Sequence, residues 1–361
     1  MPSSSTKPSS DAVKGKLLEI FGVSNPQNAA AAGEYDEVLA SPAGAKPVRE
    51  AVRLFGPAGA LRYMIDADGR RWRSNGVYTD FVGDDAKAPW DLSRSERIME
   101  GTFQSPLVSF VYERGWRQAF NANGFPGIDK EFEEVAEFFS PVQGPSSVVM
   151  DLSCGSGLMT RRLVKSNRYG RVIAGDLSPS MLGEAAQRFD KAGLTRPEFL
   201  RCDVSQLPIQ SGSVDGLHAG AALHCWTQLE AGLREVYRVL KPGGRFYAST
   251  FLVAATINTP LNQNGYKFFT VSELERYMRE AGFETVTVMQ SGRACALIRC
   301  VKADNNDNKA PDALAILQEP GMVAVAQEPG MVVVAEEPEQ EQEFSAIVPP
   351  SLDAPLEPFE E

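Results

Sequence analysis

One short turn in this sequence combines small and acidic residues at a spacing that suits ligand binding. An apolar run ends at Asp151, and an amphipathic run begins at Leu158. Between them lie small residues, among them Ser153, Cys154, Gly155 and Gly157. Glycine allows backbone torsions and a close ligand approach that a side chain would block, and the first N–H groups of a helix have no partner within it. We interpret the segment as a strand, turn and helix that bind a nucleotide-like ligand.

Two further acids end the next two apolar runs. Asp176 lies nineteen residues after Gly157, where a carboxylate can accept hydrogen bonds from both hydroxyls of a ribose. Asp203 ends the following run, beside the expected position of an adenine ring. A dinucleotide-binding turn would have a third glycine where this chain has Thr160, which weakens a pyrophosphate interpretation. Each of these residues also has a structural alternative, as turn glycines, as a helix cap for Asp176, or as a turn residue for Asp203.

The pattern around these residues predicts an α/β fold. After residue 146, β-branched runs alternate with amphipathic runs, which is typical of βαβ units in a mainly parallel sheet. We expect strands near 147–152, 171–176, 197–202, 213–218 and 244–251. A last helix is expected over 272–283, followed by two antiparallel strands within 284–301. The predicted fold is a Rossmann-like, seven-stranded, mainly parallel sheet with helices on both faces, a C-terminal antiparallel hairpin and a small N-terminal module.

Composition divides the chain into four parts. Residues 1–34 predict a disordered leader, 35–92 a small module with two strands around a turn at Asp66, and 93–302 the α/β domain. Residues 303–361 hold fourteen acids and one base and predict an acidic disordered tail.

The rest of the chain then has a net charge of about +2, so it indicates no basic nucleic-acid surface. No apolar run approaches the roughly 18 residues that span a bilayer.

Several segments in one order resemble a known family. They are DLSCGSG, GDLSPSML, DVSQLPIQSGSVDGLHAGAALHCW and EVYRVLKPGGRFYASTF. Together they resemble a class I S-adenosylmethionine-dependent methyltransferase of the ubiquinone/menaquinone-biosynthesis type. With SPLVSFVYERGWRQAFNANGFPG, the chain is similar to the uncharacterised plastid methyltransferase-like proteins of plants and algae over residues 97–300. The resemblance implies that 93–302 is a methyltransferase domain and that the chain is chloroplastic, with the cytoplasm as the alternative.

The chain departs from the family pattern at two places. The turn commonly has glycine where this chain has Ser153. The plastid relatives often carry a zinc ribbon with two Cys-x-x-Cys knuckles before the domain, whereas this chain reads SPAG at 41–44 and IDAD at 65–68. Tetrahedral zinc needs thiolate or imidazole ligands. We therefore expect 35–92 to be a degenerate zinc-ribbon-like module without metal ligands.

The resemblance also implies a cofactor and the residues that bind it. S-adenosylmethionine would be the methyl donor, with its methionine end against Asp151 and the turn of Ser153, Cys154, Gly155 and Gly157. Asp176 would bind the ribose. The adenine side would be formed by Asp203, Val204 and Leu177.

Catalytic and acceptor-binding candidates lie elsewhere. His218 and His224 are the two histidines of the chain, and an imidazole near its usual pKa of about 6.5 can act as a general base. A structural imidazole is the alternative for each. Tyr112, Trp116 and Tyr266 lie in aromatic, apolar segments that suit a flat lipophilic acceptor such as a quinol, although Tyr112 and Trp116 could instead be ordinary packing residues of one helix.

These observations lead to one favoured function and two alternatives. The favoured function is methyl transfer to a small, lipophilic or aromatic, quinol-like acceptor, with no nucleic acid and no membrane span but with peripheral membrane association left open. A non-catalytic binding or assembly protein that docks through its acidic tail is the first alternative. A nicotinamide-dependent oxidoreductase is the second, and Thr160 in place of the third glycine argues against it.

Overall fold

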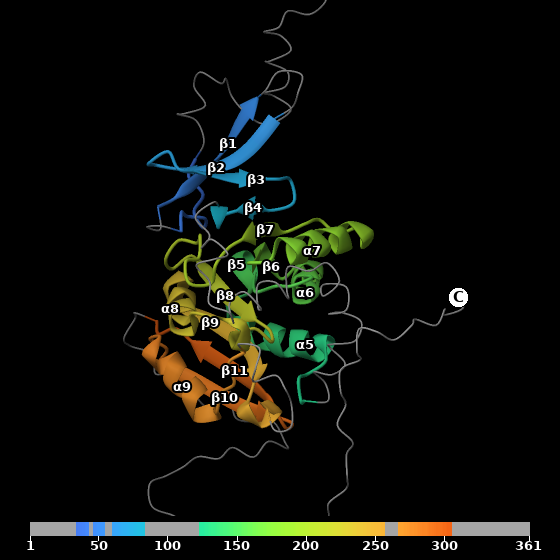
Figure 1. The fold of residues 1–361 in the computed structure, drawn as a ribbon, viewed down its shortest axis with the longest axis vertical. Coiled ribbons are helices and arrows are strands. Elements are labelled where there is room, and N and C mark those ends of the chain that lie inside the picture. Colours follow the sequence, from blue (N-terminus) through green and yellow to red (C-terminus); the bar gives the residue numbers. More distant parts are fainter. Residues whose placement is uncertain (1–33, 43–45, 55–59, 84–122, 257–265, 305–361) are drawn as a thin grey trace, which may run out of the picture. The chain divides into compact units, whose positions relative to one another are not determined.

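The apolar runs of the sequence become neighbouring strands in the computed structural model of this protein (Figure 1). The structure describes residues 34–42, 46–54, 60–83, 123–256 and 266–304. Nearly all of the acidic tail and of the predicted leader lie outside the described residues, as do Tyr112 and Trp116.

A parallel sheet forms the centre of the fold. Its strands are β5 (Gly144–Leu152), β6 (Tyr169–Asp176), β7 (Glu198–Arg201), β8 (Val214–Ala219) and β9 (Leu240–Phe251). They pair in the order β7-β6-β5-β8-β9, so the chain starts at β5, moves outward to β7 and then crosses back to β8. Open α/β sheets bind ligands where the strand order reverses in this way, which here is the carboxyl end of β5 and β8.

Two antiparallel strands and five helices complete this part. β11 (Cys295–Val301) pairs with β9, and β10 (Thr285–Ser291) pairs with β11. The helices are α5 (Ile128–Phe138), α6 (Leu158–Ser166), α7 (Pro179–Lys191), α8 (Leu229–Val239) and α9 (Val271–Glu280). Figure 1 shows α5, α6 and α7 on one side of the sheet and α8 and α9 on the other. The predicted α/β sheet with helices on both faces is present.

Each helix turns an apolar stripe toward the sheet. Leu182, Ala185 and Phe189 of α7 pack with Phe199 of β7, and Leu233 and Val236 of α8 are buried against the opposite face. Burial of one such side chain stabilises the fold by about 1.5–3 kcal/mol. None of the helices in the described part of the chain is long and apolar enough to cross a membrane.

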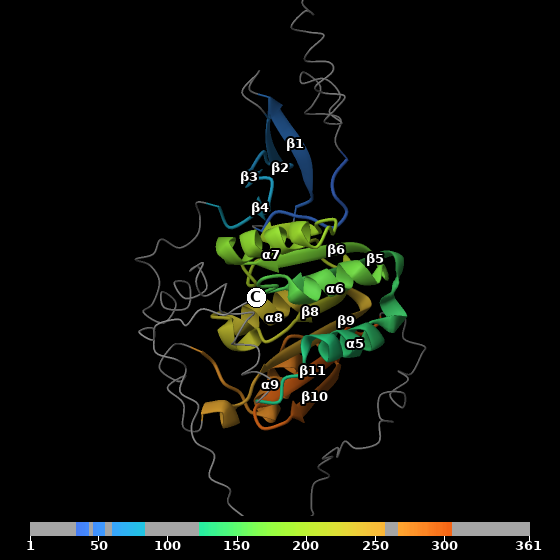
Figure 2. The same cartoon turned by 90° about the vertical axis from the view of Figure 1, so that its right-hand side faces the viewer.

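The N-terminal module is part of the same sheet. β1 (Val48–Leu54), β2 (Ala60–Asp66), β3 (Arg71–Ser74) and β4 (Thr79–Asp80) form an antiparallel meander (Figure 2). β4 then pairs in parallel with β7, which makes eleven strands in one sheet among the described residues. The sequence predicted a seven-stranded sheet and a small N-terminal module, and the four strands of the module extend the sheet formed by the seven strands β5 to β11. An edge strand exposes unpaired backbone groups, and β4 satisfies those of β7.

Candidate functional site

The turn after β5 has the left-handed backbone that its small residues predicted. The φ angles are 57° at Ser153, 54° at Gly155 and 76° at Gly157. Helix α6 begins directly after Gly157 and has no side-chain cap. A Cβ atom on Gly157 would lie 3.2 Å from that of Ala185, so both the backbone angle and the packing favour glycine there.

Ser153 is the one non-glycine residue of this turn in the left-handed region, and its side chain has a partner. Its Oγ accepts a hydrogen bond of 3.0 Å from the indole Nε1 of Trp226, which follows the short helix η5 (Leu223–Cys225). Ser153 therefore connects the turn after β5 to the loop after β8.

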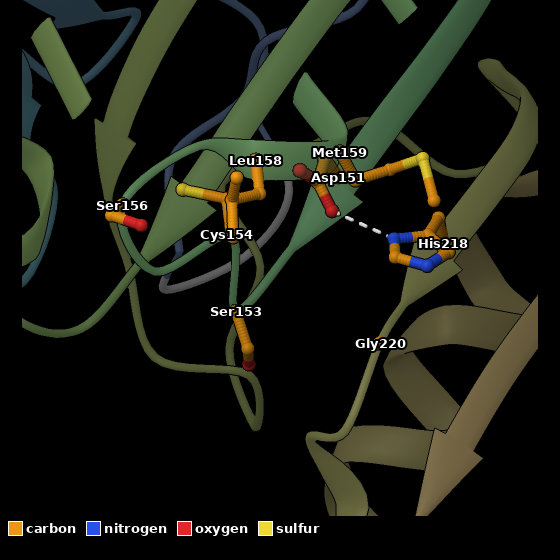
Figure 3. A pocket seen from close by; sticks show the side chains of 8 residues that line it. All are labelled: Asp151, Ser153, Cys154, Ser156, Leu158, Met159, His218 and Gly220. Atoms are coloured by element: carbon orange, nitrogen blue, oxygen red, sulfur yellow. Dashed lines mark hydrogen bonds and ion pairs between the residues drawn. The ribbon is translucent and has the colours of Figure 1, made fainter. Parts of the chain in front are cut away.

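A pocket lies between this turn and the end of β8 (Figure 3). Its lining residues are Asp151, Ser153, Cys154, Ser156, Leu158, Met159, His218 and Gly220. Three of the predicted donor-binding residues, Asp151, Ser153 and Cys154, thus line the pocket, together with one predicted catalytic residue, His218. Burial raises the pKa of Cys154 well above its usual value, with Asp176 and Asp151 adding to the effect, so this cysteine remains a thiol.

Asp176 connects the turn to the end of β6. Its Oδ2 accepts a hydrogen bond from the N–H of Gly155 and its Oδ1 accepts one from the N–H of Ser178, each at 2.8 Å. Burial raises the pKa of Asp176 to about 6, against the effect of backbone hydrogen bonds from Ser178, Gly155 and Leu177. A carboxylate has about four acceptor sites, so about one remains for a hydroxyl group of a ligand.

The predicted adenine side is less uniform. The Oδ1 of Asp203 accepts two hydrogen bonds of 2.8 Å from Ser205, one from its N–H and one from its hydroxyl, which is the turn arrangement left open as an alternative. Val204 packs against the core, whereas Leu177 is exposed over 38% of its surface. Of the three, Leu177 is the one whose side chain is open to solvent.

His218 lies in a buried cluster of charges. Its Nδ1 is 2.8 Å from Oδ1 of Asp151, and its Nε2 is 3.5 Å from Oε1 of Glu131. Burial alone would lower the pKa of His218, but the two carboxylates outweigh it and raise the pKa to about 9. His218 is therefore an imidazolium at neutral pH, with Nδ1 donating to Asp151. The other oxygen of Asp151 accepts a hydrogen bond from the hydroxyl of Thr160.

His224 is buried among aromatic rings, and its Nδ1 lies 3.3 Å from the hydroxyl of Thr250. Burial lowers its pKa to about 3, so the ring is neutral at physiological pH. The ring contacts Phe251 edge-on at 5.0 Å between centroids and lies 5.6 Å from the ring of Tyr266, the third predicted acceptor-binding residue. The structure places His224 beside Tyr266. It places His218 beside Asp151.

Glu131 is a site residue that the sequence analysis missed. It is 4% exposed in α5, near His218, and its Oε1 accepts a hydrogen bond of 3.1 Å from the hydroxyl of Ser249. Glu131 is four residues before Val135 and seven before Phe138, both of which are buried, so an acid on the apolar stripe of a helix was a signal available in the sequence. Nothing in that pattern identified its partner. No group of three metal-ligating side chains occurs among the described residues.

Comparisons with known proteins agree with this geometry. Residues 150–248 match a family model described as a methyltransferase domain. An uncharacterised chloroplastic methyltransferase of Arabidopsis thaliana is 46% identical over 168 residues, covering 45% of this chain and 47% of that protein. A second one from the same plant is 38% identical over 205 residues, covering 53% and 57%. A ubiquinone/menaquinone biosynthesis C-methyltransferase of Rhizobium rhizogenes is 29% identical over 140 residues, covering 38% and 53%.

The chain carries a methyltransferase domain over residues 150–248. The match places the turn after β5, Asp176 and His218 inside the methyltransferase domain. The chain spans about half the length of the curated relatives that it matches.

A solved structure shares the fold of the methyltransferase domain. Phosphoethanolamine N-methyltransferase 2 of Haemonchus contortus, in complex with S-adenosyl-L-methionine, superposes with a TM-score of 0.50 at 14% identity. The likeness covers 81% of this chain and 74% of that chain. At this identity it supports the Rossmann-like fold and no more.

S-adenosylmethionine is the cofactor of this domain class, and the residues present fit it. The glycine turn leaves room for close approach of a ligand, and Asp176 keeps acceptor capacity beside the turn. The pocket is lined by Ser153, Cys154 and Ser156 of the turn, together with Asp151 and His218.

Proposed function

We propose that this protein transfers a methyl group from S-adenosylmethionine to a small, lipophilic or aromatic, quinol-like acceptor. The observation that carries the proposal is the hydrogen bond from Gly155 to Asp176, which joins the turn of β5 to the acid of β6 beside the pocket. That pair supports a donor site in which Asp176 binds the adenosine part of S-adenosylmethionine and the turn binds its methionine part.

In this proposal the residues mainly bind and orient the donor. Asp151 and the turn from Ser153 to Gly157 would face the methionine end, and Asp176 would accept a hydrogen bond from a ribose hydroxyl. Leu177, Val204 and Asp203 would border the adenine. The bound donor supplies an electrophilic methyl group on a sulfonium, so alignment with the acceptor can provide roughly 7–11 kcal/mol of the rate enhancement.

Neither histidine has a pKa that suits proton abstraction near pH 7. His218 is already protonated, with a pKa of about 9, and His224, with a pKa of about 3, is a weak base. A general base works best when its pKa lies near the operating pH. We therefore assign His218 to holding Asp151 in place and His224 to the acceptor side. Their predicted catalytic roles stay predictions.

The acceptor class has support from the surroundings of His224. Phe251 contacts His224, Phe125 and Phe268, with ring centroids 4.6–6.4 Å apart, and the ring of Tyr266 lies 5.6 Å from the imidazole. Such a group of rings suits a flat, apolar molecule. The name of the Rhizobium relative, a ubiquinone/menaquinone biosynthesis C-methyltransferase, supports a quinol, and the Arabidopsis relatives support a chloroplast location.

A methyl-transfer assay tests the proposal. Purified full-length protein is incubated with S-adenosylmethionine and a panel of quinols and phenols, and S-adenosylhomocysteine is measured. We expect turnover with at least one quinol, and its loss in Asp176→Asn. Asp190→Asn is the matched control, because Asp190 forms an exposed ion pair with Arg196 in the same domain. Product from no member of the panel would contradict the acceptor class.

A further inference from the structure

One arginine connects the N-terminal module to the loop that follows Asp176. Arg201, the last residue of β7, donates from Nη1 to Oδ2 of Asp80 over 3.0 Å. Its Nε donates to the backbone oxygen of Leu177 over 3.1 Å. The side chains of Arg201 and Asp80 are 18% and 27% exposed, so the ion pair is partly shielded from water, whereas the contact with the Leu177 carbonyl is exposed. A guanidinium has several donors in a fixed planar arrangement, which lets it bridge two acceptors.

The module holds Asp80 in the orientation that this bridge needs. Oδ1 of Asp80 accepts hydrogen bonds of 3.1 Å from the N–H groups of Val82 and Gly83, which leaves Oδ2 for Arg201. The next residue, Phe81, is 4% exposed and packs on Trp72 with ring centroids 5.6 Å apart. The position of the Asp80 carboxylate therefore depends on the packing inside the module.

Contacts at a second place fix the module to the parallel strands. Asp36 forms two hydrogen bonds, of 3.0 and 2.8 Å, with the guanidinium of Arg171 in β6, which also pairs with Glu198 in β7. Leu39 forms an isolated β-bridge with Ile209. The module is thus attached at both β6 and β7, so the segment that carries Asp80 is held against the parallel strands.

The loop at the other end of the bridge belongs to the predicted donor site. Leu177 follows Asp176, and Oδ1 of Asp176 accepts a hydrogen bond from the N–H of Ser178. The carbonyl of Leu177 and the N–H of Ser178 are two ends of one peptide group. Arg201 binds one end of this peptide and Asp176 binds the other, so together they set its orientation.

We propose that Asp80 and Arg201 are positioning residues through which the N-terminal module sets the conformation of loop 176–178 and thereby the affinity for the donor. This inference rests on the proposed function. Without the carboxylate of Asp80, Arg201 loses one of its two anchors, and the peptide after Leu177 is held less firmly at the adenosine end of the site. The N-terminal module then contributes to donor binding.

Isothermal titration of the full chain with S-adenosylhomocysteine tests this proposal. We expect Asp80→Asn to raise Kd about threefold to tenfold, which is less than the full contribution of a hydrogen bond to a charged group, because Asp80 acts on the donor site through Arg201. The binding stoichiometry should stay unchanged. Asp68→Asn is the matched control, because Asp68 forms an exposed ion pair with Lys46 in the same module and should leave Kd as in the wild type.

The stoichiometry separates positioning from folding. A merely destabilised variant lowers the fraction of competent molecules and hence the stoichiometry, whereas a displaced loop changes Kd. Arg201→Lys provides a second variant that keeps the positive charge but cannot make both hydrogen bonds in the same geometry, and we expect a similar rise in Kd. A wild-type Kd in both variants would overturn the inference. Absence of binding in the wild type would instead contradict the proposed function.

Discussion

The imidazole of His218 and the carboxylate of Asp151 are direct neighbours across two parallel strands, with Nδ1 and Oδ1 2.8 Å apart. The register of β5 and β8 pairs these two residues, and α5 adds Glu131 on the other side of the ring. The acid at the end of the first strand is therefore neutralised by a histidine from the fourth, which places a buried charge cluster beside the pocket.

This cluster predicts a pH-dependent stability. The pKa of His218 is raised to about 9 in the folded protein, against about 6.5 in the unfolded chain. The contribution of His218 to the free energy of unfolding is complete below pH 6.5 and is lost as the pH rises through 9. We expect the free energy of unfolding to fall on the order of 3 kcal/mol between pH 6.5 and 9.5. Urea denaturation of the wild type and His218→Gln checks this, and equal slopes against pH in the two proteins would contradict it.

Donor affinity should also depend on pH, but it should rise with pH whereas the stability falls. The pKa of Asp176 is raised to about 6, so its carboxylate is the main form above that pH. Because the ionised group accepts a hydrogen bond from a ribose hydroxyl, binding should strengthen as the pH rises through 6. We expect Kd for S-adenosylhomocysteine to be about tenfold higher at pH 5 than at pH 7.5. Isothermal titration measures it, with Asp176→Asn as a control in which the pH dependence should disappear.

Substitutions at Ser153 should separate backbone strain from its hydrogen bond. Ser153 has a φ of 57° and accepts a hydrogen bond from Trp226. Ser153→Ala keeps the strain and loses the bond, whereas Ser153→Gly loses both. We expect the alanine variant to be less stable than the glycine variant by about 1 kcal/mol. Urea denaturation of the two variants decides, and an alanine variant as stable as the glycine one would show that the turn is not strained.

A glycine near His218 should tolerate no side chain. A Cβ on Gly220 would lie 2.7 Å from Cε1 and 2.9 Å from Nε2 of His218, and 3.0 Å from Oε1 of Glu131. Because these groups are buried, we expect Gly220→Ala to lower the free energy of unfolding by about 1–3 kcal/mol. Gly183→Ala in α7 is the control, since a Cβ there meets nothing within 4 Å, and it should stabilise the helix by about 0.5–1 kcal/mol. Equal thermal stability of the two variants would refute the steric argument.

Local patterns in the sequence predicted the elements that hold the site. The apolar runs ending at Asp151 and Asp176 became β5 and β6, and the glycines between them formed the left-handed turn. These features depend on neighbours within a few residues, so spacing and residue type suffice to predict them. The position of Asp176 beside that turn followed from the general rule that parallel strands end at one edge of a sheet.

The chemistry of particular side chains needed the tertiary structure. His218 and His224 are six residues apart and look alike in the sequence, yet their pKa values are about 9 and about 3. Two carboxylates face the first imidazole and aromatic rings face the second. Asp203 likewise looked equivalent to Asp176, but it holds its own turn through Ser205.

The sequence by itself determined the order of the strands and helices of the α/β domain and the left-handed turn after β5, because both follow from short-range patterns. Only the tertiary structure decided which groups meet across long stretches of chain. The pairing of β4 with β7 and the bridge from Asp80 through Arg201 to Leu177 join segments about 100 residues apart. Such contacts and the pKa values of buried groups depend on distances in space, and sequence periodicity carries no record of those distances.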